Sequence, residues 1–213
     1  MAVQRDKSET TTKPLRESKR QSEVLQAAAH LFFQKGFSAT TVQDVADALG
    51  FLKGSLYYYI ETKEDLLFQI LDQVHDEVDD MLDGVLELPN LGPLDRLEVY
   101  VQRQIEYNFQ NLERITVYYH DVDRLSDVRR NHILLRRKPH SRFVLGLIRQ
   151  AQAEGDADTT IDAIILSNCV FATITGTYNW YHGQFPNPSH VASSCAAFVK
   201  GAVTRNANSV SPD

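Results

Sequence analysis

Apolar residues recur at helical spacing along most of the chain, and the interruptions fall at short turns rich in Gly, Pro, Asn and Asp. Pro139 falls inside one long periodic stretch, so we expect a kink or a split there. No stretch alternates apolar and polar residues for long enough to form a strand, and the fold is predicted to be all-α. The predicted helices cover residues 18 or 22–35, 42–49, 53–59, 62–82, 93–111, 113–124, 127–154, 159–182 and 188–204.

The segment 36–66 has the spacing of a helix-turn-helix. Thr41 stands where a helix N-cap is needed, with Asp44 three residues later, and Gly50 ends the apolar period that follows. A turn of a few residues then leads into the second short helix, 53–59. A helix of this kind can enter the major groove of DNA.

Residues 36–67 contain six short motifs: Gly36-Phe37, Thr40-Thr41-Val42, Asp44-Val45-Ala46, Leu49-Gly50, Lys53-Gly54-Ser55-Leu56-Tyr57 and Lys63-Glu64-Asp65-Leu66-Leu67. Together they resemble the DNA-binding domain of the TetR family of transcriptional repressors. Ile60 departs from the family pattern, which commonly has an aromatic residue there, but Ile60 can fill the same small core. The resemblance implies an N-terminal three-helix helix-turn-helix DNA-binding domain and a C-terminal helical ligand-binding and dimerisation domain.

The same resemblance implies a role at DNA for individual side chains. Thr41, Tyr57 and Lys63 are expected to contact phosphates. The expected readers of base edges or methyl groups are Gln43, Lys53, Ser55 and Tyr58, with Lys53 to a guanine as the main hydrogen-bonded contact. Gly54 would allow the backbone to approach the groove closely.

The expected domains are a disordered arm at 1–17, the DNA-binding domain at 18–63 and the ligand-binding and dimerisation domain at 64–206. The arm is polar and has no apolar period. Its positive charge is compatible with tracking phosphates or reaching a minor groove, but a tail without a role is the more common explanation of such a segment.

The charge distribution agrees with a protein that touches DNA at one end. The 213 residues carry a net charge of −6, but residues 1–63 hold nine Lys or Arg against seven acidic residues, so they carry +2 and the remainder −8. No stretch has the apolar length of a membrane span, and the polar N-terminus is unlike a signal peptide, so a cytoplasmic protein is expected. Cys169 and Cys195 lie in apolar stretches and are expected to be buried free thiols.

The predicted helices 159–182 and 188–204 carry more apolar surface than a one-sided surface helix needs. One side of 159–182 is expected to line a cavity, while small residues on another side pack against a second copy. A monomeric core would also explain the pattern, but reading a palindrome requires two recognition helices. We therefore expect a homodimer through these two helices.

An internal small-molecule site needs an apolar cleft with a few hydroxyls and amides. Each aromatic candidate taken alone is more typical of an ordinary core, and only the family resemblance makes the set a binding hypothesis. The candidate lining residues are Tyr100, Gln104, Tyr107, Asn108, Tyr118, Tyr119, Phe143, Leu147, Asn168, Phe171, Thr175 and Tyr178.

Residues 179–183 and the turn after them resemble a TetR subgroup that represses fatty-acid, steroid and other acyl-coenzyme A catabolism. A coenzyme A thioester needs cations for its phosphates, and residues 156–199 contain no Lys or Arg. The candidate anchors, which an ordinary solvated basic face would explain equally well, are Arg136, Arg137, Lys138, Arg142 and Arg149. An efflux-pump repressor that senses aromatic or cationic drugs is the alternative within the family.

Other chemistry finds little support in the sequence. Residues 120–123 include metal-ligand types, but neighbours at this spacing do not converge on one helix face, so no metal site is predicted. The chain has no glycine-rich phosphate loop and no nucleophile elbow, and no cofactor is expected. A helical enzyme or ligand-binding module would process or hold a ligand without DNA, and an architectural DNA-binding protein would bind DNA regardless of metabolites.

Overall fold

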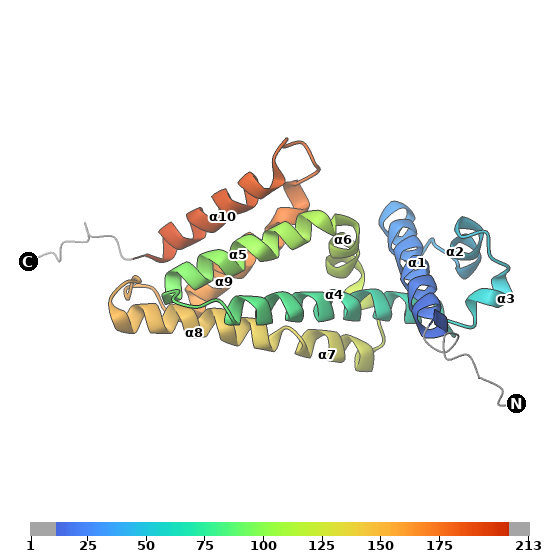
Figure 1. Cartoon of the computed structure of the whole chain (residues 1–213), viewed down its shortest axis with the longest axis horizontal. Helices are drawn as coiled ribbons and strands as arrows, with labels where there is room; N and C mark the ends of the chain where they lie inside the picture. Colours follow the sequence, from blue (N-terminus) through green and yellow to red (C-terminus); the bar gives the residue numbers. More distant parts are fainter. Residues whose placement is uncertain (1–11, 205–213) are drawn as a thin grey trace, which may run out of the picture. The chain divides into compact units, whose positions relative to one another are not determined.

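A computed structural model describes residues 12–204, and its side chains from residue 19 onward. Within 12–204 the chain forms helices and one isolated bridge between Ala157 and Thr204, without a strand, which confirms the all-α prediction. The helices, shown in Figure 1, are α1 Thr12–Lys35, α2 Val42–Ala48, α3 Lys53–Leu56, α4 Lys63–Leu86, α5 Pro93–Gln110, α6 Leu112–Asp121, the 3₁₀ turn η1 Val122–Arg124, α7 Asp127–Leu135, α8 Lys138–Glu154, α9 Ala163–Trp180 and α10 Pro188–Val203.

Most helix boundaries agree with the predicted ones. The split expected at Pro139 is confirmed, because α7 ends at Leu135 and α8 begins at Lys138. Proline is tolerated in the first turn of a helix, where its missing N–H has no partner to lose. The helix predicted at 127–154 is therefore two helices.

Two helix ends in the N-terminal part differ from the predictions. Helix α1 begins at Thr12, inside the segment predicted as a disordered arm, while residues 1–11 lie outside the described part. Helix α3 ends at Leu56 and not at residue 59. The amides of Tyr58 and Tyr59 donate to carbonyls three residues back, at 3.4 and 2.9 Å, so the chain tightens into a turn there.

The chain divides into two compact units, and α4 contributes to both. Among the described residues, unit 1 comprises 12–72 and 116–130, and unit 2 comprises 73–115 and 131–204. The predicted boundary at 63/64 differs from this division, since unit 1 also takes the first turns of α4 and the segment 116–130.

Unit 1 is held together by a small apolar core beneath the helix-turn-helix. Helix α2 packs against α1 and α3. Leu56 is the inward-facing residue of α3, and Ile60 is buried just after it, so the aliphatic side chain does take the place expected of an aromatic one.

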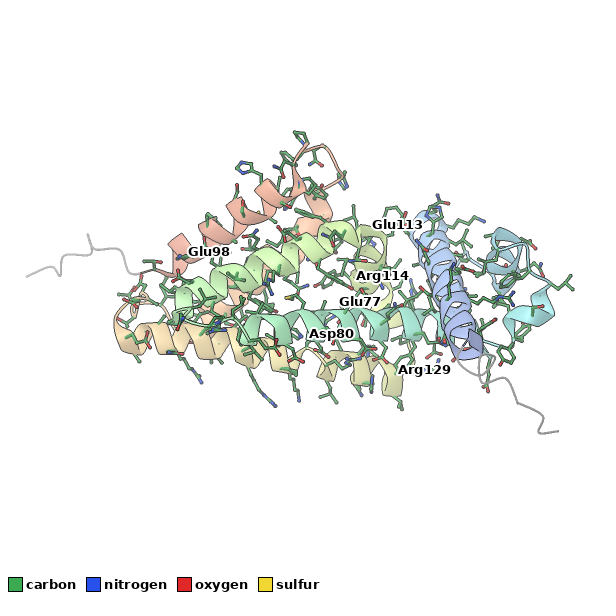
Figure 2. The ribbon with its side chains drawn as sticks, viewed as in Figure 1. Glu77, Asp80, Glu98, Glu113, Arg114 and Arg129 are labelled. Carbon is green, nitrogen blue, oxygen red and sulfur yellow. The ribbon has the colours of Figure 1, made fainter. Side chains whose placement is uncertain are left out.

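Unit 2 is organised around α5, which packs against α8, α9 and α10. Its core is a single apolar cluster to which all these helices contribute. Polar contacts tie its edges: Lys200 of α10 forms ion pairs with Asp95 and Glu98 of α5 at 2.6 and 2.7 Å. In Figure 2, Glu77 of α4 and Arg114 of α6 lie next to each other, joined by a hydrogen bond of 2.9 Å.

Candidate nucleic-acid interface and effector-binding region

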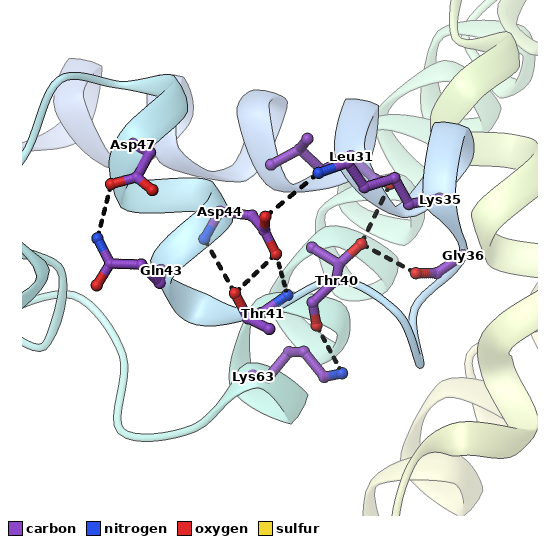
Figure 3. A network of polar contacts seen from close by, with 9 residues as sticks. All are labelled: Leu31, Lys35, Gly36, Thr40, Thr41, Gln43, Asp44, Asp47 and Lys63. Atoms are coloured by element: carbon purple, nitrogen blue, oxygen red, sulfur yellow. Dashed lines mark hydrogen bonds and ion pairs between the residues drawn. The ribbon is translucent and has the colours of Figure 1, made fainter.

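A complete capping box sets the start of α2. The Asp44 carboxylate accepts hydrogen bonds from the Thr41 amide and hydroxyl, both at 2.7 Å, while the Asp44 amide donates to the Thr41 hydroxyl oxygen at 3.1 Å (Figure 3). Lys35 of α1 adds an ion pair to Asp44 at 3.2 Å. The predicted cap is thus confirmed, and it fixes where the helix-turn-helix begins.

Because of the capping box, the stability of the folded protein is expected to vary with pH in the acid range. Hydrogen bonds from the Thr41 side chain, the Thr41 backbone and Lys35 lower the pKa of Asp44 to about 2. A carboxyl group whose pKa is lowered by folding stabilises the folded state at every pH above its pKa in the unfolded chain. This stabilisation is lost as the pH falls to the lower pKa of the folded state. We expect Asp44→Asn to lower the urea midpoint at pH 6, and the difference from the original protein to shrink between pH about 4 and about 2. A difference that stays constant over this range would contradict the assignment.

Lys63, at the start of α4, holds the turn between α1 and α2. Its ammonium donates to the carbonyl oxygens of Phe37, Ser38 and Thr40 at 2.7, 3.2 and 2.8 Å, and it lies 4.4 Å from the centre of the Phe37 ring. Figure 3 shows the contact with Thr40. An ammonium has three N–H donors, and here each has an acceptor. The structure therefore gives Lys63 a positioning role in addition to the predicted phosphate contact.

The neighbouring carboxylates of α4 bind the segment 116–130 within unit 1. Asp65 accepts from the Glu61 and Thr62 amides at 2.8 and 2.6 Å, which caps α4, and its other oxygen contacts the Arg129 guanidinium. Glu64 accepts from the Ser126 amide at 2.9 Å. Burial raises the pKa of Asp65, but the hydrogen bonds from Thr62, Arg129 and Glu61 outweigh it and leave the pKa below its usual value.

Helix α3 presents most of the predicted DNA-reading residues together. Lys53, Gly54 and Ser55 are exposed on it, and Tyr57 and Tyr58 follow with 48% and 72% of their surface exposed. A Cβ added to Gly54 would meet no described atom within 4 Å, so the protein itself does not require glycine there. Thr41, a predicted phosphate contact, is exposed at the cap of the preceding helix, and Gln43, a predicted base reader, is exposed on that helix.

Two features of this surface bear on the predicted contacts. The Gln43 amide donates to Asp47 at 2.6 Å, so it must leave this partner to reach a base. Leu52, just before α3, is 82% exposed, and the sequence analysis did not single it out. The signal that could have identified Leu52 is its apolar side chain in the short turn between Gly50 and Lys53.

Most predicted pocket residues lie in unit 2, around α5. Gln104 and Asn108 are buried and joined at 3.3 Å, and the Asn108 amide donates to the Ile174 carbonyl of α9 at 3.2 Å. Tyr100 packs edge-to-face on Phe143, with ring centroids 5.3 Å apart. The other members of the set that are buried or half-buried in unit 2 are Tyr107, Leu147, Phe171, Thr175 and Tyr178.

Three candidates do not join this group. Asn168 is exposed, because it lies on the side of α9 that also exposes Ile165 and Cys169, and it faces away from the core of unit 2. Tyr118 and Tyr119 belong to unit 1. Asn168 is therefore excluded as a residue lining the interior of unit 2.

Two carboxylates of α4, those of Glu77 and Asp79, are paired with arginines within unit 2. Glu77 binds Arg114 through both oxygens, at 2.9 and 2.5 Å, and accepts the Tyr107 hydroxyl at 2.8 Å. Burial raises the pKa of Glu77, but Arg114 and Tyr107 outweigh it and leave the pKa below its usual value. The pKa of Tyr107 is raised, chiefly by burial, so its hydroxyl remains a donor.

A second, partly buried network links α4, α5 and α8. The His140 Nε2 lies 2.9 Å from the Asp79 carboxylate, and its Nδ1 lies 3.1 Å from the Tyr100 hydroxyl. Arg136 binds Asp79 at 2.6 Å and Asp76 at 2.8 Å. Arg136, one of the candidate coenzyme A anchors, is thus already engaged within unit 2.

Helices α9 and α10 carry large apolar side chains on their outer sides. Ile164 and Ile165 are 51% and 56% exposed on α9, and Phe198 is 68% exposed on α10. We call these three residues the outer apolar face. Both cysteines are free, as predicted, but Cys169 is exposed on α9 and Cys195 is only partly buried, so the expectation of a buried thiol is wrong for Cys169.

The described residues offer little for other chemistry. No group of His, Cys, Asp and Glu within them is placed to hold a metal ion, and residues 120–123 do not form one. None of the helices in this part of the chain is long and apolar enough to cross a membrane.

Two family models match the chain. One, for bacterial regulatory proteins of the tetR family, matches residues 24–70, and the other, for the tetracyclin repressor-like C-terminal domain, matches residues 90–199. The HTH-type transcriptional repressor KstR2 of Mycolicibacterium smegmatis is 26% identical over 195 residues, which are 91% of this chain and 95% of that protein. KstR2 of Rhodococcus jostii is 50% identical over 54 residues, which are 25% of this chain and 26% of that protein.

Solved structures show the same architecture over most of the chain. The ketosteroid transcriptional regulator KstR2 of Mycobacterium tuberculosis superposes with a TM-score of 0.81 at 26% identity, covering 88% of this chain and 96% of that one. AibR in complex with isovaleryl coenzyme A and operator DNA superposes with a TM-score of 0.76 at 22% identity, covering 86% and 98%. The chain belongs to the TetR family, and it is a ligand-responsive, DNA-binding transcriptional repressor and not an enzyme.

Proposed function

We propose that this repressor binds a pseudo-palindromic operator as a homodimer through α9 and α10, and releases it when a small hydrophobic or acyl-coenzyme A type effector enters unit 2. The proposal of a dimer rests on the outer apolar face. Large aliphatic and aromatic side chains at these exposures are costly in water and are typical of the centre of a subunit interface. A twofold interface would place α9 and α10 of one copy against the same helices of the other.

For operator recognition we assign the base contacts to exposed residues of α2, of α3 and of the turn that follows α3. Lys53 is the proposed reader of a guanine, with Ser55, Tyr58 and Gln43 at neighbouring base edges or methyl groups. Thr41 and Tyr57 are the proposed phosphate contacts. The same role for Lys63 requires one of its N–H groups to exchange a backbone carbonyl for a phosphate oxygen.

The pairing of charges in unit 2 favours a thioester over a cationic drug. A cationic aromatic drug would be favoured by uncompensated carboxylates, but Glu77 is paired with Arg114 and Asp79 with Arg136. Lys138, Arg142 and Arg149 are exposed on α8 and remain the proposed anchors for coenzyme A phosphates. The relatives named for ketosteroid regulation and the AibR complex with isovaleryl coenzyme A support the same class of effector.

Release of DNA requires the effector to prefer the state that does not bind it. Helix α4 is continuous where units 1 and 2 divide, and we propose that it transmits the change. To move the protein from almost fully DNA-competent to almost fully released, the effector must bind the released state about 10⁴-fold more tightly, which corresponds to about 5.5 kcal/mol.

The test is a fluorescence-anisotropy titration against a duplex from the promoter of the protein's own gene, after native mass spectrometry of the purified protein. The competitors are free coenzyme A, a short-chain acyl-coenzyme A, a steroid-ring coenzyme A thioester and a quaternary ammonium drug. We expect a dimer mass, operator binding, and release by at least one thioester but not by free coenzyme A. Release by the ammonium drug alone would favour the alternative, an efflux-pump repressor that senses cationic drugs. A DNA complex insensitive to every competitor would contradict the effector class.

A further inference from the structure

Leu52 stands at a position where a polar side chain would stabilise the local structure better than leucine does. It is the N-cap of α3, with φ −68° and ψ 138°, and its carbonyl accepts the Ser55 amide at 2.8 Å. Its side chain makes no capping hydrogen bond. Ser, Thr, Asp or Asn at an N-cap would satisfy a free amide of the first turn, whereas leucine leaves that amide to water.

The leucine side chain is also not used for packing in unit 1. It is 82% exposed, while Leu56, one turn later on α3, is fully buried. Burying an aliphatic side chain is the usual reason for its presence, and this reason is absent for Leu52 among the described residues. Its exposure is matched in unit 1 by Val128, which lies on α7.

The position of Leu52 places it on the surface proposed to meet DNA. Lys53, Gly54 and Ser55 follow it directly and are all exposed. The space around Gly54 is open, with no described atom within 4 Å of an added Cβ, so a duplex can approach this end of α3 closely. Leu52 would be buried by the same approach.

We propose that Leu52 reads a thymine in the operator by packing its aliphatic side chain against the C5-methyl group. This inference rests on the operator recognition proposed for α3. In the major groove the thymine methyl is the apolar group that a base edge offers, and leucine has no hydrogen bond to give to any other base. The thymine lies beside the base pair contacted by Lys53, because the two residues are adjacent at the start of α3.

The experiment separates the methyl contact from every other effect of the side chain. A duplex is first selected from a random-core library with the original protein, and each thymine in it is then replaced singly by deoxyuridine, which lacks only the methyl group. Affinities are measured by anisotropy for the original protein and for Leu52→Ala, Val128→Ala and Tyr58→Ala. Val128→Ala removes an equally exposed aliphatic side chain outside α3 and serves as the matched control.

In the original protein, deoxyuridine is expected to lower affinity about fourfold at one thymine per half-site, from about 0.8 kcal/mol for one buried methyl-sized group. Leu52→Ala is expected to lose this sensitivity at that thymine and to bind the unmodified duplex at least about fourfold more weakly. Val128→Ala keeps the full sensitivity at every thymine. Urea unfolding of Leu52→Ala, with an unchanged midpoint, verifies that it is folded.

Two results would overturn the inference while leaving operator recognition intact. One is a Leu52→Ala protein that retains every deoxyuridine penalty, and the other is a penalty abolished in Tyr58→Ala instead, which would assign the methyl to Tyr58. If the original protein selects no duplex at all, the operator recognition fails and the inference falls with it.

Discussion

Replacing either Ile165 or Phe198 by Glu is expected to leave the protein monomeric and to weaken operator binding by about 10³-fold or more. These side chains are 56% and 68% exposed on the outer apolar face. A carboxylate there would be buried without a partner in the dimer, and the twofold axis would introduce it twice. A monomer contacts one half-site, so its affinity falls toward the non-specific range, which is typically 10³-fold or more weaker.

The matched control for this prediction is Leu135→Glu. Leu135 is 53% exposed on α7, close to the value for Ile165, but it is not on α9 or α10. Sedimentation equilibrium should find Leu135→Glu dimeric and the two face variants monomeric. If Leu135→Glu dissociates and Ile165→Glu does not, the interface lies on α7 and the proposed face is wrong.

Gly54→Ala is expected to stabilise the protein and, at the same time, to weaken operator binding by about 30-fold or more. Alanine is about 0.5–1 kcal/mol more favourable than glycine inside a helix, and the added Cβ meets no described atom within 4 Å. Against DNA the same methyl would fill the space through which α3 approaches the bases, and overpacking at a close contact costs about 1–3 kcal/mol at each half-site. Stability and affinity should therefore move in opposite directions.

Gly146 of α8 provides the comparison for this second prediction. It too lies inside a helix, is exposed, and would place a Cβ in open space. Gly146→Ala should raise the urea midpoint as Gly54→Ala does while leaving operator affinity unchanged. Equal affinity in both variants would show that α3 does not approach the bases at Gly54.

Local features of the fold were predictable because their causes lie within a few residues. The Thr41 capping box joins residues three apart, and the split near Pro139 follows from the missing amide of proline. The faces of α9 were not predictable in the same way. Ile165 is exposed and Leu166 buried, yet both are apolar, so periodicity could not show that Asn168 faces outward.

Contacts between distant parts of the chain were beyond the sequence pattern. Arg129 and Asp65 are 64 residues apart, and nothing in the spacing of either segment indicates that they meet. The Lys63 clamp, by which we mean its hydrogen bonds to three backbone carbonyls, spans up to 26 residues. It depends on how the turn before α2 is folded. For the same reason the family motif predicted a phosphate contact for Lys63 but could not reveal its three carbonyl partners.

The contacts of Asp65 with Arg129 and of Glu64 with Ser126 restrict how this regulator can be recombined with others. A hybrid made by grafting residues 1–63 onto the body of another repressor would carry the helix-turn-helix and the Lys63 clamp, but it would leave behind both carboxylates and their partners. The polypeptide leaves unit 1 after residue 72 and returns to it at 116, so the transferable module is discontinuous. An engineered biosensor built from this protein needs to import residues 116–130 together with the N-terminal segment, or to supply its own replacement for Arg129.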